Sequence, residues 1–559
     1  MKRMKCNYYT LVGLALIALP TWAQQKNQTH AKDTTVNRTV VVEQEYNPDI
    51  LDASKINVLP RVEEPVVGKK EVEYAITPAP SGSIPINQMQ AYIGQEVQPK
   101  TQPGYVRLGY GNYGNLDLLG NYLFRLSDKD RLNVNFKMDG MNGELTGKWD
   151  GGSEKWDAFY YRTRANIDYT HQFGKVDLNL SGNFGLSNFN YRPNSINGKQ
   201  KFTSGSMQIG ALSTDETLPV QFNVSTGLML YQRQKNNSFT TSPQETQIKT
   251  QANVSGSISD EQRIHVALTM NNIIYQNIDF ENYTALGLNP YYELNNDSWL
   301  LHLGANVDMS FGYGKSMRVS PDVTAQYVFS DSYVLYAKAT GGKQINDFRR
   351  LERLSPYGDF ATLVLPNEVS APVPYSQQLA DTYEQLNAVV GFKASPFPGV
   401  WFNLYGGYQD IKDLTFNNVA FLAFEQANAH NTYIGFEASY DYKDIVSLSA
   451  AGKYRNWSSE QPMALLIQPA SEFTFNADVR PISPLTLTMG YQYIGRKKEM
   501  DHLEKLSPVS NLYIGAAYHL FKGVSVYARI NNLLNKDYQY YLGYPTEGIN
   551  FLGGLSFQF

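Results

Sequence analysis

The chain ends in Ile549–Phe559, INFLGGLSFQF, and this stretch decides the fold class. Every second position from Phe551 to Phe559 is apolar or glycine, while the positions between them are mostly small or polar. A period of two indicates a β-strand with one apolar face. Because the chain stops on an aromatic residue, we expect an outer-membrane barrel in which Phe557 and Phe559 close the last seam and face lipid.

The N-terminus has the layout of a secretory signal. Lys2, Arg3 and Lys5 precede the apolar run Leu11–Leu19, and Ala23 offers a small residue for cleavage. This run is too short to span a bilayer as a helix. We therefore expect residues 1–23 to be a signal peptide, with a buried N-terminal helix as the alternative.

The amino-acid composition excludes several kinds of site and partner. The single cysteine, Cys6, lies inside the expected signal, so the mature chain has neither a disulfide nor a thiolate metal site. The mean hydropathy of −0.38 is compatible with a barrel, because only alternate residues face lipid. The 40 tyrosines suit a headgroup boundary, although a Tyr-rich β-sandwich would look similar. With a net charge of −4 and no basic block, nucleic acid is not an expected partner.

From Gly104 onward the chain repeats one unit, an alternating strand followed by a turn or a polar loop. Leu132–Met138, Leu301–Met309 and Leu485–Tyr493 each place apolar residues on one face and mostly polar or small residues on the other. The pattern itself does not say which face lies outside. The secretion signal favours lipid outside and water inside.

Short and long connections alternate along this region, as in bacterial barrels. The long ones are Asn142–Lys155, Arg192–Gln200, Lys235–Gln247, Gly341–Thr382, Lys412–Asn428 and Asn535–Gly548. The pattern predicts an all-β fold, a transmembrane antiparallel β-barrel of about 22 strands. This count depends on Thr284–Leu294 being a strand. The last strand should pair with Tyr105–Asn112.

Residues 24–102 differ from the rest. Eight prolines fall between Pro48 and Pro103, and proline removes backbone donors from β-ladders. We expect an extended N-terminal arm, with a small folded domain as the alternative. The predicted organisation is thus a signal peptide (1–23), an arm (24–102) and a barrel (103–559).

The C-terminal half resembles the TonB-dependent outer-membrane receptor family. The resemblance rests on Leu301–Arg318, Ser320–Lys338, Tyr383–Asp413 and Leu512–Phe559, within which Asn531–Tyr544 is similar to the family's segment before the final strand. It implies a barrel of about 22 strands. It also implies import of a bulky nutrient, driven through a periplasmic contact with TonB.

The chain departs from this family at its N-terminus. Thr39, Val40, Val41, Val42 and Glu43 resemble a TonB-contact segment, with a β-prone stretch in a tail as the alternative. The family's plug domain needs far more residues than 24–102. Since barrels of 16–18 strands already leave a water channel, something must fill this one. The candidates are the arm, the long loop around 343–382 folded inward, or a partner chain.

No catalytic, cofactor or metal site is expected. The stretch Gly109–Gly114 matches G-x-G-x-x-G, but Leu116–Leu126 after it reads as a strand, so we interpret it as the tight first outer loop. No histidine has a partner at metal-ligand spacing, and no G-x-S-x-G motif occurs. The basic run Arg496–Lys498 is explained by a solvated loop or by lipid A phosphates.

Three functions stay open at this point. The first is a receptor-transporter for a bulky solute. The alternative is a plug-less barrel that acts as a scaffold or subunit of an outer-membrane complex, and a passive porin is the third. The expected partners are outer-membrane lipid and lipopolysaccharide, with TonB, other outer-membrane or periplasmic proteins, or surface lipoproteins. The expected location is the bacterial outer membrane, with the arm and the C-terminus on the periplasmic side.

Overall fold

A computed structural model describes the barrel region of the chain, namely residues 102–149, 152–193, 198–215, 217–235, 242–330, 332–364, 373–418, 423–496, 507–541 and 543–559. The expected signal peptide, the arm up to residue 101 and the segment Thr39–Glu43 lie outside these residues. None of the helices in the described part is long and apolar enough to cross a membrane.

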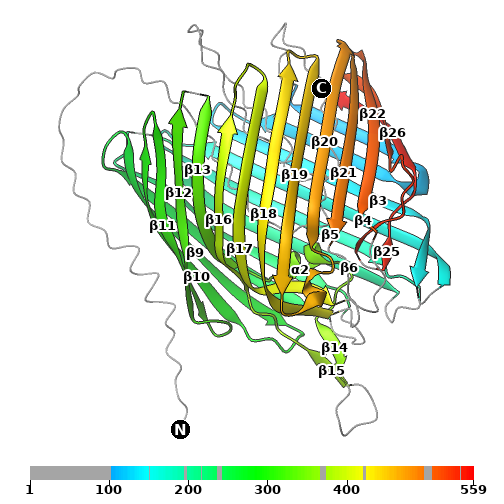
Figure 1. Cartoon of the computed structure of the whole chain (residues 1–559), viewed down its shortest axis with the longest axis horizontal. Coiled ribbons are helices and arrows are strands. Elements are labelled where there is room, and N and C mark those ends of the chain that lie inside the picture. Colours follow the sequence, from blue (N-terminus) through cyan, green and yellow to red (C-terminus); the bar gives the residue numbers. More distant parts are fainter. Residues whose placement is uncertain are drawn as a thin grey trace. The chain divides into compact units, whose positions relative to one another are not determined.

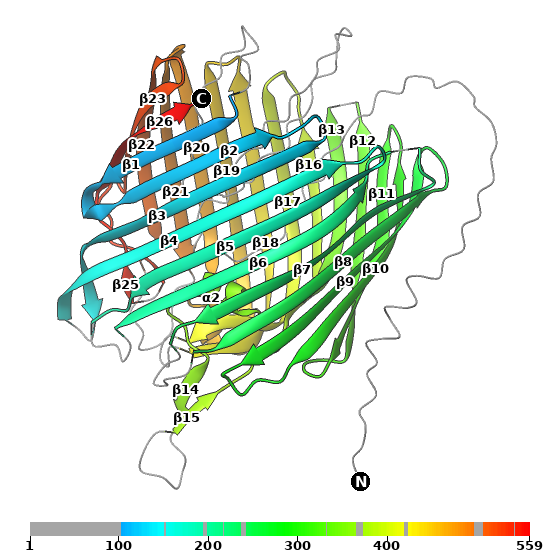
Figure 2. The same cartoon turned by 180° about the vertical axis from the view of Figure 1, so that it is seen from behind.

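The described strands form one closed antiparallel sheet of 22 strands, which confirms the predicted fold class (Figures 1 and 2). Each barrel strand pairs with the next one along the chain, and β1 pairs with β26 to close the ring. The barrel strands are β1 (Gly104–Gly111), β2 (Leu116–Arg125), β3 (Asp130–Trp149), β4 (Gly152–Gln172), β5 (Val176–Asn190), β6 (Lys199–Ser213), β7 (Val220–Arg233), β8 (Gln244–Ser257), β9 (Gln262–Gln276), β10 (Tyr283–Asn295), β11 (Trp299–Phe311), β12 (Met317–Phe329), β13 (Tyr333–Gln344), β16 (Thr382–Ala394), β17 (Val400–Asn418), β18 (Ala423–Tyr442), β19 (Val446–Ser459), β20 (Pro469–Ile482), β21 (Leu485–Arg496), β22 (Val509–Phe521), β23 (Val524–Asn531) and β26 (Asn550–Gln558). The loops add the 3₁₀ turns η1 (Asn112–Gly114) and η2 (Pro462–Leu465), the helix α2 (Phe348–Leu354) and two small hairpins, β14 (Ala361–Val364) with β15 (Val373–Ser376) and β24 (Gln539–Tyr541) with β25 (Tyr544–Pro545).

The seam joins the two ends of the barrel region, as predicted for Tyr105–Asn112. Tyr105 lies opposite Gln558, and the register continues to Gly111 opposite Leu552. Beyond this ladder the backbones of Gly104 and Phe559 exchange hydrogen bonds of 2.9 and 3.0 Å. The last residue of the chain therefore belongs to the closed wall.

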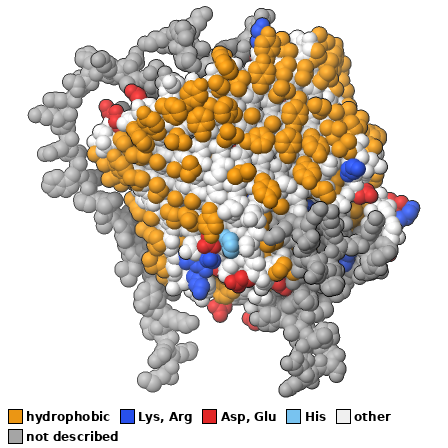
Figure 3. Space-filling view, in the orientation of Figure 1, with side chains coloured by type: hydrophobic (Ala, Val, Ile, Leu, Met, Phe, Trp, Pro, Cys, Tyr) orange, Lys and Arg blue, Asp and Glu red, His pale blue; other side chains and the backbone are white. Residues whose placement is uncertain are grey.

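The two faces of the wall differ in the way that lipid outside and water inside require. On β26, Phe551 is 55% exposed on the outer face, whereas Ser556 is buried on the inner face. On β3, Phe136 points outward and Lys137 inward, and this alternation recurs around the ring. Figure 3 shows hydrophobic side chains covering much of the outer face in that view. Large apolar groups on the outer face suit a lipid environment.

Aromatic rings gather on the outer face next to the short connections. Trp299, Tyr327, Phe329, Tyr333 and Phe392 form a continuous chain of ring contacts, with neighbouring centroids 4.7–6.1 Å apart. Such rings have an apolar body and, in Trp and Tyr, a polar tip, so they suit the boundary between lipid tails and headgroups.

The structure also tests the predicted connections. Thr284–Leu294 is part of strand β10, so this prediction is confirmed. Asn142–Lys155 and Lys412–Asn428 were expected as loops, and this is wrong, because β3–β4 and β17–β18 continue through most of these residues. Beyond the lipid-facing part the outer face of these strands becomes polar, as at Glu144 and Thr146, while backbone pairing needs no apolar side chain. The stretch Gly109–Gly114 does contain a tight turn, η1.

Candidate functional site: the loop across the barrel mouth

In the connection between β13 and β16, of which residues 345–364 and 373–381 are described, the helix α2 lies inside the barrel at the end with the long connections, whereas the hairpin β14–β15 projects away from that end (Figures 1 and 2). Its sequence explains the short helix α2. The Asp347 carboxylate caps the helix by accepting a 2.7 Å hydrogen bond from the Arg350 amide. Phe348 and Leu351, spaced by one turn, form the buried side of the helix. We call residues 345–381 the mouth loop.

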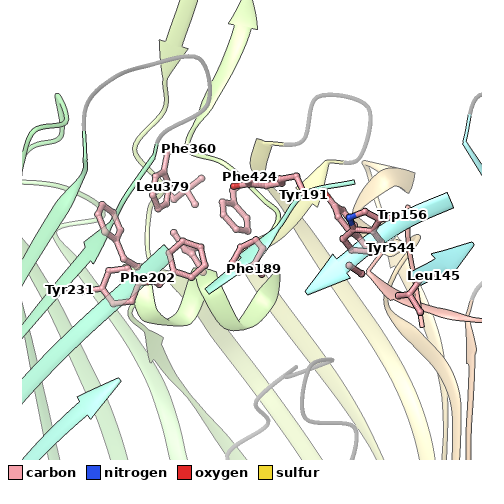
Figure 4. Packing of buried hydrophobic residues seen from close by; sticks show 13 residues of the cluster. Leu145, Trp156, Phe189, Tyr191, Phe202, Tyr231, Phe360, Leu379, Phe424 and Tyr544 are labelled. Atoms are coloured by element: carbon pink, nitrogen blue, oxygen red, sulfur yellow. The ribbon is translucent and has the colours of Figure 1, made fainter. Parts of the chain in front are cut away.

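The mouth loop brings its own apolar side chains against the inner wall. Phe348 is 2% exposed, and its ring lies 4.5 Å from the ring of Phe360. Figure 4 shows the aromatic residues of this cluster converging from several strands and from the loop. The buried members of the cluster are Leu145, Trp156, Ala158, Phe189, Tyr191, Phe202, Tyr231, Phe348, Leu351, Phe360, Leu379, Phe424 and Tyr544. A hydrophobic core thus lies at the mouth of the barrel. The rest of the barrel interior, toward the short turns, is lined mostly by polar side chains.

Carboxylates fix α2 to the wall formed by β5, β7 and β8. Glu352 accepts 2.7 Å and 2.6 Å hydrogen bonds, one on each oxygen, from the hydroxyls of Ser187 and Tyr231. The buried Glu245 accepts a 3.0 Å bond from the Phe348 amide at the start of the helix. The helix is therefore fixed at both ends to the wall, and its N-terminal amides of Phe348 and Arg350 have side-chain acceptors.

Arg233, at the end of β7, fixes the segment after the helix. Its guanidinium donates a 2.6 Å hydrogen bond to the carbonyl oxygen of Gly358. The same group lies 5.1 Å from the centroid of the Phe202 ring and 5.2 Å from that of Phe360. A cation between two aromatic faces is attracted to both, so Arg233 connects the loop to the wall through charge and ring contacts together.

Other contacts reach distant parts of the rim. The Phe424 amide on β18 donates a 3.0 Å hydrogen bond to the carbonyl oxygen of Asp359. The Tyr357 ring stacks on the Tyr544 ring of the hairpin β24–β25, and Tyr544 in turn meets Trp156 of β4 edge-on. The mouth loop starts between β13 and β16 yet contacts β5, β7, β8, β18 and this hairpin. It therefore spans the mouth.

The two ends of the mouth loop are tied to each other. Asp381 accepts hydrogen bonds of 3.0 Å from the Asn346 amide and 2.9 Å from the Tyr283 hydroxyl. The Asn346 side chain donates a 2.6 Å bond to the carbonyl oxygen of Ala380. Burial raises the pKa of the Asp381 carboxyl. This closed base makes the loop a compact unit that can move only when these bonds break.

The structure also places the residues that the sequence singled out. Phe557 lies in the seam strand opposite Val106 and Val524, and Phe559 continues that strand. The mouth loop was one of three candidates for filling the lumen, but its anchoring residues were missed. The spacing of Phe348, Leu351 and Leu354 was the signal that could have found α2. Among the described residues, no group of three or more His, Cys, Asp or Glu side chains is arranged to hold a metal ion.

Comparison with known proteins identifies the fold. No family model and no curated protein matches the sequence. Solved structures do match, each over 82% of this chain: the FrpB iron transporter of Neisseria meningitidis (F5-1 variant; 12% identity, 82% of that chain, TM-score 0.64), the ferripyoverdine receptor of the outer membrane of Pseudomonas aeruginosa (12%, 72%, 0.61) and a mutant of the ferric enterobactin receptor PfeA of Pseudomonas aeruginosa (11%, 80%, 0.61). The chain has the barrel fold of TonB-dependent receptors, as the resemblance predicted. These neighbours are transporters or receptors rather than enzymes.

Proposed function

We propose that this protein is an outer-membrane receptor-transporter of the TonB-dependent type, and that it takes up a bulky solute through its lumen. The observation that supports this most directly is the mouth loop. A 22-stranded barrel is wide enough for a large aqueous passage, and here its mouth is spanned by a loop with its own hydrophobic core. A passive porin would need a permanently open path.

The cost of moving the mouth loop argues for driven passage. Phe348, Leu351, Phe360 and Leu379 are each at most 7% exposed. Returning such a side chain to water costs about 1.5–3 kcal/mol, so releasing all four costs on the order of 8 kcal/mol. Since 1.4 kcal/mol is a factor of ten, spontaneous release would occur in roughly one molecule in a million. A bound solute or an energy source must therefore favour the open state.

The orientation follows from the two kinds of connection. We infer that the short turns face the periplasm and the mouth loop faces outward, because bacterial barrels have short periplasmic turns. Gly104 pairs with Phe559 at the short-turn end, so the arm and the C-terminus would both be periplasmic. Thr39–Glu43 would then be available to TonB, and the aromatic rings next to the short turns would sit at the inner headgroup layer. Lipopolysaccharide would surround the opposite end.

Planar-bilayer conductance tests the role of the mouth loop. We expect the wild type to be silent and the double variant F348A/L351A to show frequent openings, because it removes the buried face of α2. Phe397→Ala is the matched control, since Phe397 is an exposed phenylalanine near a short turn. Steady wild-type conductance equal to that of the double variant would establish a porin instead.

Deletion of residues 36–45 tests energised uptake. We expect the deletion to abolish growth on one bulky nutrient as sole source, while removal of residues 26–35 leaves growth intact. Unchanged growth on every bulky nutrient tried would contradict the proposal. Stoichiometric partner proteins in mild detergent, together with unchanged growth, would favour the scaffold alternative.

A further inference from the structure

The inner wall at β1–β5 contains an unusual row of cations. The cross-strand register runs from Arg107 to Leu119, then to Lys137, to Arg164 and to Gly185. Ile167 on β4 faces lipid, so Arg164, three positions away, lies on the lumen side of the same strand. Lys137 and Arg164 are directly opposite each other, and like charges in this arrangement destabilise a sheet.

The next row along the barrel supplies too few carboxylates. Arg107 is neutralised by Asp117: its Nη2 donates a 2.9 Å hydrogen bond to the carboxylate, and its Nε lies 2.7 Å from the other carboxylate oxygen. Arg162 donates two hydrogen bonds, of 2.9 and 2.6 Å, to the Asp139 carboxylate. The Lys137 ammonium lies 3.6 Å from that same carboxylate. The region thus holds four cations but only two carboxylates, so it carries two positive charges in excess. The cations are Arg107, Lys137, Arg162 and Arg164, and the carboxylates are Asp117 and Asp139.

Arg164 is the free member of this group. Its side chain is exposed toward the lumen, and among the described residues it has neither a hydrogen-bond partner nor an ion-pair partner. Its directly opposite neighbour on β5 is Gly185, which contributes no side chain beside Arg164. A planar guanidinium with free donors matches a carboxylate or a phosphate in a bidentate fashion.

We propose that Lys137 and Arg164, supported by Arg162, form an anion-binding site on the lumen wall, and that it takes a carboxylate or phosphate group of the transported solute. The inference rests on the proposed function and names the chemical class of its substrate. An anion there relieves the repulsion between Lys137 and Arg164. Because the wall has a low dielectric constant, the electric field of the excess positive charge is concentrated in the aqueous lumen, where it attracts an anionic solute.

Calorimetric titration of the full chain in detergent tests the site, with citrate and inorganic phosphate as separate probes at low salt. We expect the wild type to bind at least one probe. The probe with the higher affinity shows whether the site prefers a carboxylate or a phosphate. K137Q/R164Q should bind at least tenfold more weakly. R164K should lower the affinity for the probe severalfold, because lysine keeps the positive charge but lacks the two parallel donors of the guanidinium. Added salt should weaken wild-type binding.

The control is Lys175→Gln, which removes an exposed lysine next to a short turn, where it pairs with Asp215. It should bind like the wild type, and the heat-dependent gel mobility of every variant reports whether the barrel is folded. Equal affinity of wild type and K137Q/R164Q, or binding of neither probe by the wild type, would overturn the site. Such a result would leave the conductance test of the mouth loop unaffected, so the two failures are distinguishable.

Discussion

Replacing Asp117 by Asn should weaken the closure of the barrel. Asp117 lies on β2, where its carboxylate accepts a 2.9 Å hydrogen bond from Arg107 Nη2 on β1 and forms an ion pair with Nε at 2.7 Å. It also accepts a 3.1 Å bond from the Tyr527 hydroxyl on β23, which reaches across both seam strands, β26 and β1. Gly109 and Gly554 make room for that ring, since a Cβ on Gly109 would lie 2.2 Å from the Tyr527 hydroxyl oxygen. One carboxylate therefore ties both sides of the seam together.

The magnitude follows from the burial of the partners. Arg107 is 7% exposed and Asp117 is 9% exposed. Removing one partner of a buried ion pair costs about 3–5 kcal/mol, because an uncompensated charge stays behind. The weaker bond from Tyr527 contributes roughly 1 kcal/mol more. We expect D117N to lower the unfolding free energy by about 4–6 kcal/mol, and D117N combined with R107M to recover most of it.

Urea unfolding in detergent, followed by the heat-dependent gel mobility of the folded barrel, measures this effect. Asp260→Asn is the matched control, because Asp260 is exposed in a short turn. A midpoint for D117N equal to that of D260N would refute the reasoning. A double variant as unstable as the sum of both single variants would show that Asp117 and Arg107 act independently.

Three further predictions concern other parts of the molecule. Gly490→Ala should cost about 1–3 kcal/mol in urea unfolding, because the new Cβ would lie 2.1 Å from the Tyr513 ring, and G490A combined with Tyr513→Leu should be less impaired. Burial raises the pKa of Glu547 to about 7 despite the hydrogen bonds it accepts from Asn115, so the unfolding free energy should fall as pH rises from 4.5 to 7, by up to about 3 kcal/mol. A pH series of unfolding curves checks this, and Glu547→Gln should lack the slope. Phe348→Ala should cost about 3–5 kcal/mol of loop closure and admit large antibiotics into cells, whereas an unchanged antibiotic sensitivity would speak against the role of the loop.

The wall could be predicted from the sequence because lipid imposes a period of two. Leu301–Met309 and the doubtful Thr284–Leu294 both show that alternation, and both are strands. Hydrophobic alternation no longer marks strands in the parts of the barrel that extend beyond the lipid. Asn142–Lys155 has no continuous apolar face, yet nearly all of it is paired backbone. Hydrophobic alternation reports the environment of side chains, and strand pairing continues beyond it.

The mouth could not be predicted in the same way. Its cluster joins Trp156, Phe360 and Tyr544 from parts of the chain that lie far apart in sequence. Nothing local to Phe360 indicates that its partners are Arg233 on β7 and Phe424 on β18. The unpaired Arg164 was also invisible, because its isolation depends on the register that puts Lys137 and Gly185 beside it.

The seam has a consequence for biogenesis. The Tyr527–Asp117 bond joins residues 410 positions apart, and the bond from Phe551 to Asn112 spans 439. Neighbouring hairpins can form early, because their partners are close along the chain. The ring cannot close until β26 has reached the membrane, because β26 alone joins β23 to β1. A chain that lacks β26 would expose the unpaired edges of β1 and β23, and such edges are sites of aggregation.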